Sequence, residues 1–349
     1  MKISRRTWIC FGLAAALAVV ALSGLVDPRL AGGAALAMAV APFPTDPQLT
    51  AIAIAYRNTS YIADSVLPRD TVGTQEFKWW SYPIAESFML PDTKVGRRSQ
   101  PNEIDLTATE LASKTDDYGL EDPIPQADIN NAPAGKDPLG HATMTLADYI
   151  ALDREKRTAD LVFDANQYPA ANKVTLAGTD QWSDFAAAGS DPIEDIMAGL
   201  DACLVRPNVM TMGQEVWSKL SRHPKIQKAI HGNEGDTGIA RRAQIAELFE
   251  LDEVLVGQSR LNTAKKGQAA TLARVWGKHC LLHFRSKLAT VSGGTLTFGL
   301  TAQWGGRISG QMADSKIGLR GGTRVRVGES VKELIVASQA AFFIQNAVA

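Results

Sequence analysis

Apolar and polar residues follow two different periods along the first part of the body of the chain. Over 104–109 they alternate one by one, which is the period of a strand. Residues 76–82 mix aromatic and polar side chains as a partner strand would. The polar stretch between them contains Pro and Gly and predicts a turn. We therefore expect an arm over 38–70 followed by a long hairpin over 71–125.

The next pattern predicts a loop over 122–138 and a long helix over 145–166. Four apolar residues share one side of this helix: Tyr149, Leu152, Ala159 and Phe163. A block of charged residues at 153–157 interrupts that side. One flank of the helix should therefore be solvated or paired with opposite charges.

The segment 174–257 alternates helices with short apolar strands. Asp191, Pro192 and Glu194 form a helix start, with an N-cap, a proline at the first helical position and an acid in the first turn. The apolar patterns that follow predict further elements: strands at 208–213 and 253–257, and helices at 214–220 and around 245–249. This order predicts an α+β fold with a compact core.

Beyond residue 277 the pattern changes to strands separated by glycine pairs. The alternation at the end predicts two strands paired with each other, 323–327 and 333–336. A hairpin as long as 71–125 has little core of its own, so we expect it to pack against something else, such as another subunit.

Composition narrows the range of functions. The 349 residues are 45% hydrophobic and 21% charged, which allows one large domain or two modest ones. With 36 basic and 37 acidic residues, the formal net charge is −1. The chain as a whole therefore has no positive field that would hold a nucleic acid.

The N-terminal segment 1–37 differs from the rest. Basic residues precede an uncharged apolar run over 8–26, and small residues follow as far as Ala37. This order of residues is typical of a secretory signal peptide. Met38 follows at once and resembles an ordinary translation start, so the segment is either a targeting segment or absent from the mature protein. Both interpretations stay open, and neither contributes to the predicted fold.

Residues that could carry chemistry are few. The chain contains none of the common nucleotide, nucleophile or zinc-protease motifs. His279 and His283 fit a half-buried strand better than a metal site, because no third ligand is near in sequence. Cys203 lies beside a helical stripe and is expected to be a buried structural thiol, since no basic partner accompanies it. We therefore predict no catalytic, cofactor-binding or metal-binding residues and no cofactor.

Five residues of the hairpin are candidates for contacts between subunits. Lys94, Arg97 and Arg98 lie at its tip, where solvation or pairing with a neighbour is favoured over phosphate binding. Trp79 and Trp80 point to opposite faces of their strand. They fit anchors for two packing surfaces better than a stacking platform.

Several segments resemble one family when taken in order. These are 117–124, 246–257, 262–264 with 276–277, and 324–329 continuing through 346–348. Together with the order of the elements, they resemble the major capsid proteins of tailed phages over roughly 46–349. The segment 1–37 departs from the family: some members carry a removable N-terminal scaffolding region, which is usually charged and helical, whereas this segment is short and apolar.

The resemblance implies the Hong Kong 97-type capsid fold. It implies an N-terminal arm at 38–70, an extended hairpin (the E-loop) at 71–125, and a central A-domain at 186–310. The peripheral P-domain would combine 126–185 with 311–349, and the long helix would be its spine.

The resemblance also implies a mechanical function and no enzymatic one. Copies would assemble in the host cytoplasm into hexamers and pentamers of an icosahedral head, with no membrane in the mature form. The shell would enclose double-stranded DNA without reading its sequence, and scaffold, portal and decoration proteins are candidate partners. Two alternatives remain open: an exported periplasmic binding protein, and an encapsulin-like nanocompartment shell.

Overall fold

The computed structural model describes most of the chain after residue 45. The described ranges are 46–55, 61–81, 90–101, 103–104, 109–232, 238–265, 267–287, 290–291 and 296–349. The N-terminal segment 1–37 therefore lies outside the described residues, as do 82–89 and 105–108 of the predicted hairpin. Among the described residues, no helix is both long and apolar enough to cross a membrane.

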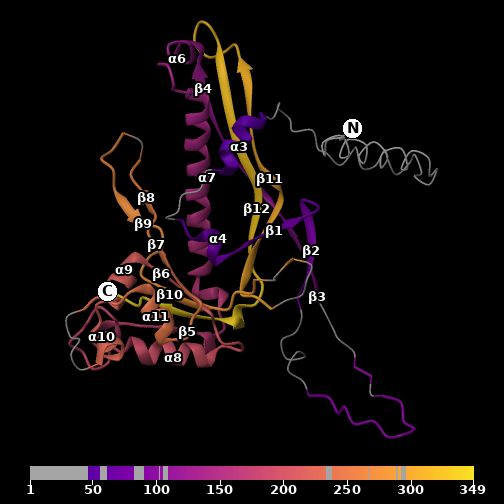
Figure 1. Cartoon of the computed structure of the whole chain (residues 1–349), viewed down its shortest axis with the longest axis vertical. Coiled ribbons are helices and arrows are strands. Elements are labelled where there is room, and N and C mark those ends of the chain that lie inside the picture. The colour runs from indigo at the N-terminus through magenta and orange to yellow at the C-terminus, as the bar shows by residue number, and fades with distance from the viewer. Residues whose placement is uncertain are drawn as a thin grey trace, which may run out of the picture. The chain divides into compact units, whose positions relative to one another are not determined.

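One sheet is built around a long antiparallel pair of strands (Figure 1). Its four strands, in spatial order, are β1 (Arg69–Val72), β11 (Gly299–Asp314), β12 (Gly322–Ile335) and β4 (Asp116–Pro125). The β11–β12 ladder shifts register between Trp304 and Ile308, and Gly305 has a φ of 66° there. Because glycine adopts this left-handed conformation without steric strain, the Gly305-Gly306 pair lets β11 form a bulge.

A second sheet is buried on both faces. Its strands, in spatial order, are β5 (Lys173–Thr175), β13 (Ala341–Gln345), β10 (Cys280–His283), β6 (Val209–Gly213) and β7 (Glu253–Gly257). Successive side chains enter different cores: Cys280 and Leu282 enter one, and Leu281 enters the other. Burial on both faces explains why these short strands are almost continuously apolar in sequence.

Helices and short ladders complete the described part of the chain. The helices are α3 (Pro47–Ala55), α4 (Ala63–Val66), α6 (Gln126–Asn130), α7 (Pro138–Val162), α8 (Pro192–Ala202), α9 (Gln214–Leu220), α10 (Pro224–His231) and α11 (Arg242–Leu248). The two-stranded ladders are β2 (Glu76–Ser81) with β3 (Thr109–Lys114), and β8 (Arg260–Asn262) with β9 (Leu272–Arg274). Short 3₁₀ segments lie at Ala165–Gln167, Ala170–Asn172, Gly178–Asp180 and Ser338–Ala340.

The long helix α7 joins two hydrophobic cores. Its first half contributes Leu146 and Ile150 to a core shared with α3 and the four-stranded sheet. Its second half contributes Ala159 and Val162 to a core under the five-stranded sheet. The third core, on the other face of that sheet, is closed by α8, α9 and α11. The helix therefore fixes the four-stranded sheet and the five-stranded sheet to a common support.

Several predicted elements are confirmed. Helix α8 begins at the predicted signature, where Asp191 Oδ1 accepts from the backbone N–H of Ile193 at 3.1 Å and of Glu194 at 3.2 Å. The strands β6 and β7 and the helices α9 and α11 occupy the predicted positions. Residues 76–81 do pair in a hairpin ladder, although their described partner is β3, and most of the predicted strand at 104–109 lies outside the described residues.

Three predictions about residues 122–166 are wrong. Helix α7 begins at Pro138 because Asp137 caps it, accepting from Leu139 N at 3.1 Å. The predicted loop therefore contains the end of β4 and the short helix α6 instead. Tyr149 is 56% exposed, because the buried side of α7 runs through Leu146 and Ile150.

The two predicted C-terminal strands are one strand. Both 323–327 and 333–336 fall on or beside β12, which pairs with β11 and β4 rather than with itself. Gly328, between the two segments, lies inside the ladder opposite Gly119. The residues on both sides of it therefore pair continuously with β4, from Gly322 to Val331.

Candidate functional site

The tip of the hairpin carries three of the cations selected from the sequence. Lys94, Arg97 and Arg98 are all exposed. The two arginines occupy the central positions of a turn that is closed by a 3.0 Å hydrogen bond from Ser99 N to Gly96 O. The structure therefore presents Arg97 and Arg98 on one exposed turn, with Lys94 exposed two residues before it.

The tryptophans occupy a different part of the hairpin. Trp79 is half-buried, and its indole Nε1 donates to Ser113 Oγ at 3.2 Å across the ladder. The side chain of Trp80 lies outside the described part of the structure. Trp79 belongs to the β2–β3 ladder and the cations to the tip, so the candidate contact residues do not form one site.

Between β1 and β4, Phe77 and Thr115 are the buried side chains among the described residues. Among the described side chains of β2 and β3, Phe77 alone is buried. Leu90 and Ile104, near the tip, are largely exposed. A two-stranded ladder with so little core is marginal in water, so this segment depends on contacts made elsewhere.

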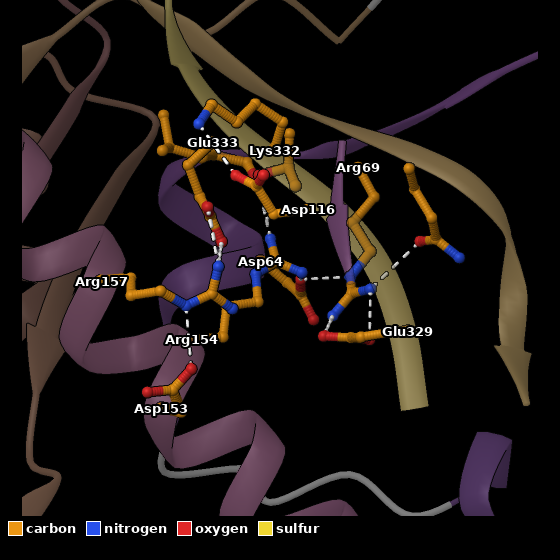
Figure 2. A network of polar contacts seen from close by, with 12 residues as sticks. Asp64, Arg69, Asp116, Asp153, Arg154, Arg157, Glu329, Lys332 and Glu333 are labelled. Atoms are coloured by element: carbon orange, nitrogen blue, oxygen red, sulfur yellow. Dashed lines mark hydrogen bonds and ion pairs between the residues drawn. The ribbon is translucent and has the colours of Figure 1, made fainter. Parts of the chain in front are cut away.

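A cluster of ion pairs holds the segments that lead into and out of the hairpin (Figure 2). Its centre is Glu329 on β12, whose side chain is fully buried. Arg69, at the start of β1, donates to Glu329 Oε2 at 2.9 Å, and Arg307, in the bulge of β11, does so at 3.1 Å. Burial favours the protonated carboxyl, but these guanidiniums hold the pKa of Glu329 below its ordinary value. One carboxylate thus ties three strands together.

Arg154 of α7 reaches the same region from the helix. Its NH2 donates to Leu67 O at 3.3 Å and to Thr301 Oγ1 at 3.1 Å. Its NH1 lies 2.6 Å from Asp64 Oδ1, which is an ion-pair distance without the angles of a hydrogen bond. Burial and the nearby charge of Arg69 lower the pKa of Arg154 to about 10. The guanidinium stays charged at neutral pH and fixes the helix to the arm that precedes β1.

The neighbouring residue Glu155 connects this arm to the second core. Glu155 is buried and accepts from Ala63 N at 2.8 Å and from the indole N–H of Trp276. Burial raises the pKa of Glu155 to about 6, against the opposing effect of these hydrogen bonds. Helix α7 therefore holds the arm through both members of an adjacent Arg–Glu pair.

The strand that leaves the hairpin is held by the same helix. Arg157 lies 3.5 Å from the centre of the Tyr118 ring on β4 and pairs with Glu333 at 2.9 Å. Asp116, at the start of β4, pairs with Lys332 at 3.0 Å. Both ends of the hairpin are thus fixed to α7 and β12, which sets the direction in which the hairpin leaves the core.

The sequence indicated only half of this cluster. The charged block at 153–157 was predicted to be solvated or charge-paired, and the pairing is confirmed. Its partners Asp64, Glu329 and Glu333 are far away in sequence and carry no local signal. The pairing of β12 with β4 and β11 brings the two glutamates to the helix, and α4 carries Asp64.

The other candidate residues have structural surroundings. His283 is fully buried, and burial lowers its pKa to about 3, so its ring is neutral. Burial raises the pKa of the Cys203 thiol to about 12, which leaves no thiolate at neutral pH. Within the described ranges, no group of His, Cys, Asp and Glu side chains is arranged to hold a metal ion.

Comparisons with known proteins identify the family. A sequence model described as Phage major capsid protein E matches residues 142–260. The chain is 55% identical over 312 residues to the major capsid protein of Pseudomonas phage JBD67, a match that spans 89% of this chain and 100% of that protein.

Solved structures share the fold. A phage-related protein from Bordetella bronchiseptica RB50 superposes with a TM-score of 0.67 at 22% identity, over 88% of this chain and 98% of that protein. A putative prophage capsid protein from E. coli CFT073 does so with a TM-score of 0.52 at 15% identity, over 87% and 99%. The expected α+β capsid fold is therefore confirmed. By its identity to the JBD67 protein along that protein's whole length, the chain belongs to the family of phage major capsid proteins, which are structural proteins and not enzymes.

Proposed function

We propose that copies of this chain assemble into hexamers and pentamers that close an icosahedral phage head around double-stranded DNA. The observation that carries the proposal is the hairpin. It buries almost none of its own described side chains, yet both of its ends are fixed by ion pairs. A segment that is fixed in direction but has no core of its own suits a contact on a neighbouring copy.

Each part of the chain has a role in this proposal. The hairpin at 71–125 is the E-loop, and its part between β1 and β4 lies over the adjacent subunit, with Trp79, Trp80, Lys94, Arg97 and Arg98 as contact residues. Helix α7 is the spine of a P-domain formed by 126–185 and 311–349. The A-domain at 186–310 converges at the centre of each hexamer or pentamer. Scaffold, portal and decoration proteins are further candidate partners.

The near-neutral charge of the chain supports enclosure of DNA without specific binding. A strongly basic wall would retain the genome when it leaves the head, and the net charge of −1 avoids this. The DNA is thus contained rather than recognised.

The experiment that tests the proposal removes the hairpin tip. Deletion of residues 85–110 should leave a folded subunit, because the described tip residues contribute no buried side chain to any of the three cores. Circular dichroism would check the fold, and negative-stain microscopy would count closed shells. We expect the deletion to abolish them.

A milder variant changes the charge of the hairpin tip without removing the tip. Arg97→Glu with Arg98→Glu reverses two exposed charges and should reduce the yield of shells without affecting stability. The matched control replaces both arginines by lysine, which keeps the charge and should keep the shells. Normal particles from both the deletion and the charge reversal would refute the role of the hairpin.

A further inference from the structure

One leucine is fully exposed at the connection between the two longest strands. Leu319 lies in the segment 315–321, between β11 and β12, and its relative exposure is 101%. The connection is anchored on both sides. Lys316 N donates to Asp314 Oδ1 at 2.8 Å, and Gln126 N donates to Gly321 O at 3.0 Å. Because these hydrogen bonds hold the turn in place, the exposed Leu319 side chain has a defined position on the surface.

A pocket of about 530 Å³ opens at the same end of the four-stranded sheet. It is formed where α6 ends and α7 begins, and its apolar walls include Ala132, Pro133 and Pro138. Figure 1 shows α6 beside the β11–β12 connection, and the pairing of Gly322 with Pro125 places them together. The pocket is large enough for a leucine side chain, yet the Leu319 of the same chain is fully exposed and does not fill it.

The charges around the two features are complementary. Lys316 and Arg320 flank Leu319, and both are exposed. Asp128 and Asp137 line the pocket, together with a single lysine, Lys136. The turn is therefore cationic around an apolar centre, and the pocket has apolar walls with two acids, so a contact between them would bring opposite charges together.

We infer that Leu319 of one copy inserts into the pocket between α6 and α7 of a second copy. Since projection and pocket lie at the same end of the subunit, each copy can fill its neighbour's pocket and have its own filled. Such head-to-tail contacts close into a ring when the rotation between copies divides a full turn. The inference rests on the proposed shell and adds to it a specific contact between copies.

Disulfide trapping tests the contact directly. The full chain with Arg320→Cys and Ala132→Cys, which keeps Leu319, is assembled, oxidised and separated by electrophoresis without reductant. We expect a ladder of linked copies that ends at a fixed number and disappears on reduction. The two single-cysteine variants are the controls, because the native cysteines remain in them, and they should give no ladder.

A second variant measures the need for the leucine. Leu319→Ser should lower the yield of closed shells at least tenfold, while Leu319→Met should retain it. Particles of the double-cysteine variant without a ladder would overturn the inference and leave the shell standing. Full yield from Leu319→Ser would also overturn it, and so would lost shells without a crosslink, since Leu319 would then contact another surface. Absence of particles from the unmodified chain would refute the shell itself.

Discussion

Replacing the buried Glu329 by glutamine isolates the contribution of its charge. The substitution keeps the shape of the side chain but leaves Arg69 and Arg307 without their shared carboxylate. Loss of one member of a buried ion pair costs about 3–5 kcal/mol. The side chains of Arg69 and Arg307 keep 22% and 15% exposure, so water would partly compensate them. We therefore expect Glu329→Gln to lower the free energy of unfolding by about 2–3 kcal/mol at pH 7.

The stability difference between wild type and Glu329→Gln should depend on pH in one direction. The pKa of Glu329 is lowered in the folded state from its ordinary value of 4.5. Its contribution to stability is therefore complete above that value and is lost as the pH falls through the lower, folded pKa. The difference between wild type and Glu329→Gln should accordingly shrink towards zero in strongly acidic buffer.

Urea unfolding of unassembled subunits, followed by tryptophan fluorescence, measures both quantities. Lys332→Ala is the matched control on the same strand, because the Lys332–Asp116 pair is exposed and should contribute less than about 1 kcal/mol. A loss below 1 kcal/mol for Glu329→Gln at pH 7 would contradict the central role of this carboxylate. An equal loss at neutral and acidic pH would show that packing, rather than charge, is responsible.

Three further predictions concern other parts of the chain. Gly213→Ala should prevent folding to a soluble subunit, because its Cβ would lie 1.9 Å from the carbonyl oxygen of Trp276; expression trials would show this. Asp191→Ala should cost about 1–2 kcal/mol in urea unfolding, because α8 loses its N-cap and Lys225 loses its partner. Intact-mass spectrometry of particles should give subunits that begin at or near Met38, because the apolar run 8–26 exposed on every copy would drive aggregation.

Each of these predictions has a clear contrary result. A soluble Gly213→Ala subunit of wild-type stability would mean that β6 and the Trp276 segment can separate at little cost. An unchanged urea midpoint for Asp191→Ala, beside a destabilised Asp137→Ala, would show that the cap matters only for the longer helix. A mass for all 349 residues in particles would mean that the shell itself buries the apolar segment.

The elements that local chemistry determines could be read from the sequence. The Asp-Pro start of α8 predicted its position, and the short apolar strands β6 and β7 were recognised. The same Asp-Pro signature at Asp137 was missed, because the following residues Gly140 and His141 weaken the helical pattern. The caps are therefore a better guide to helix starts here than the hydrophobic period.

The long-range parts could not be read in this way. Some partners of the charged block on α7 are local, but others are far away in sequence, such as Leu67 for Arg154 and Glu333 for Arg157. No local pattern marks Glu329 as buried. The pocket beside α6 was also hidden, because the sequence there reads as a loop. In these places the pairing of strands distant in sequence, rather than local secondary-structure propensity, determines which side chains are buried or paired.

The bulge in β11 has a mechanical consequence. A regular ladder resists twisting, because each cross-strand hydrogen bond opposes the rotation of its neighbours. The register shift near Arg307 interrupts this resistance inside the longest ribbon of the subunit. A force on the 315–321 end of the β11–β12 ribbon should therefore twist the ribbon mainly at the bulge. The ion pair between Arg307 and Glu329 should oppose this twisting. We therefore expect the stiffness of the ribbon at the bulge to depend on this buried ion pair and, because buried pairs are weakly screened, to change little with salt.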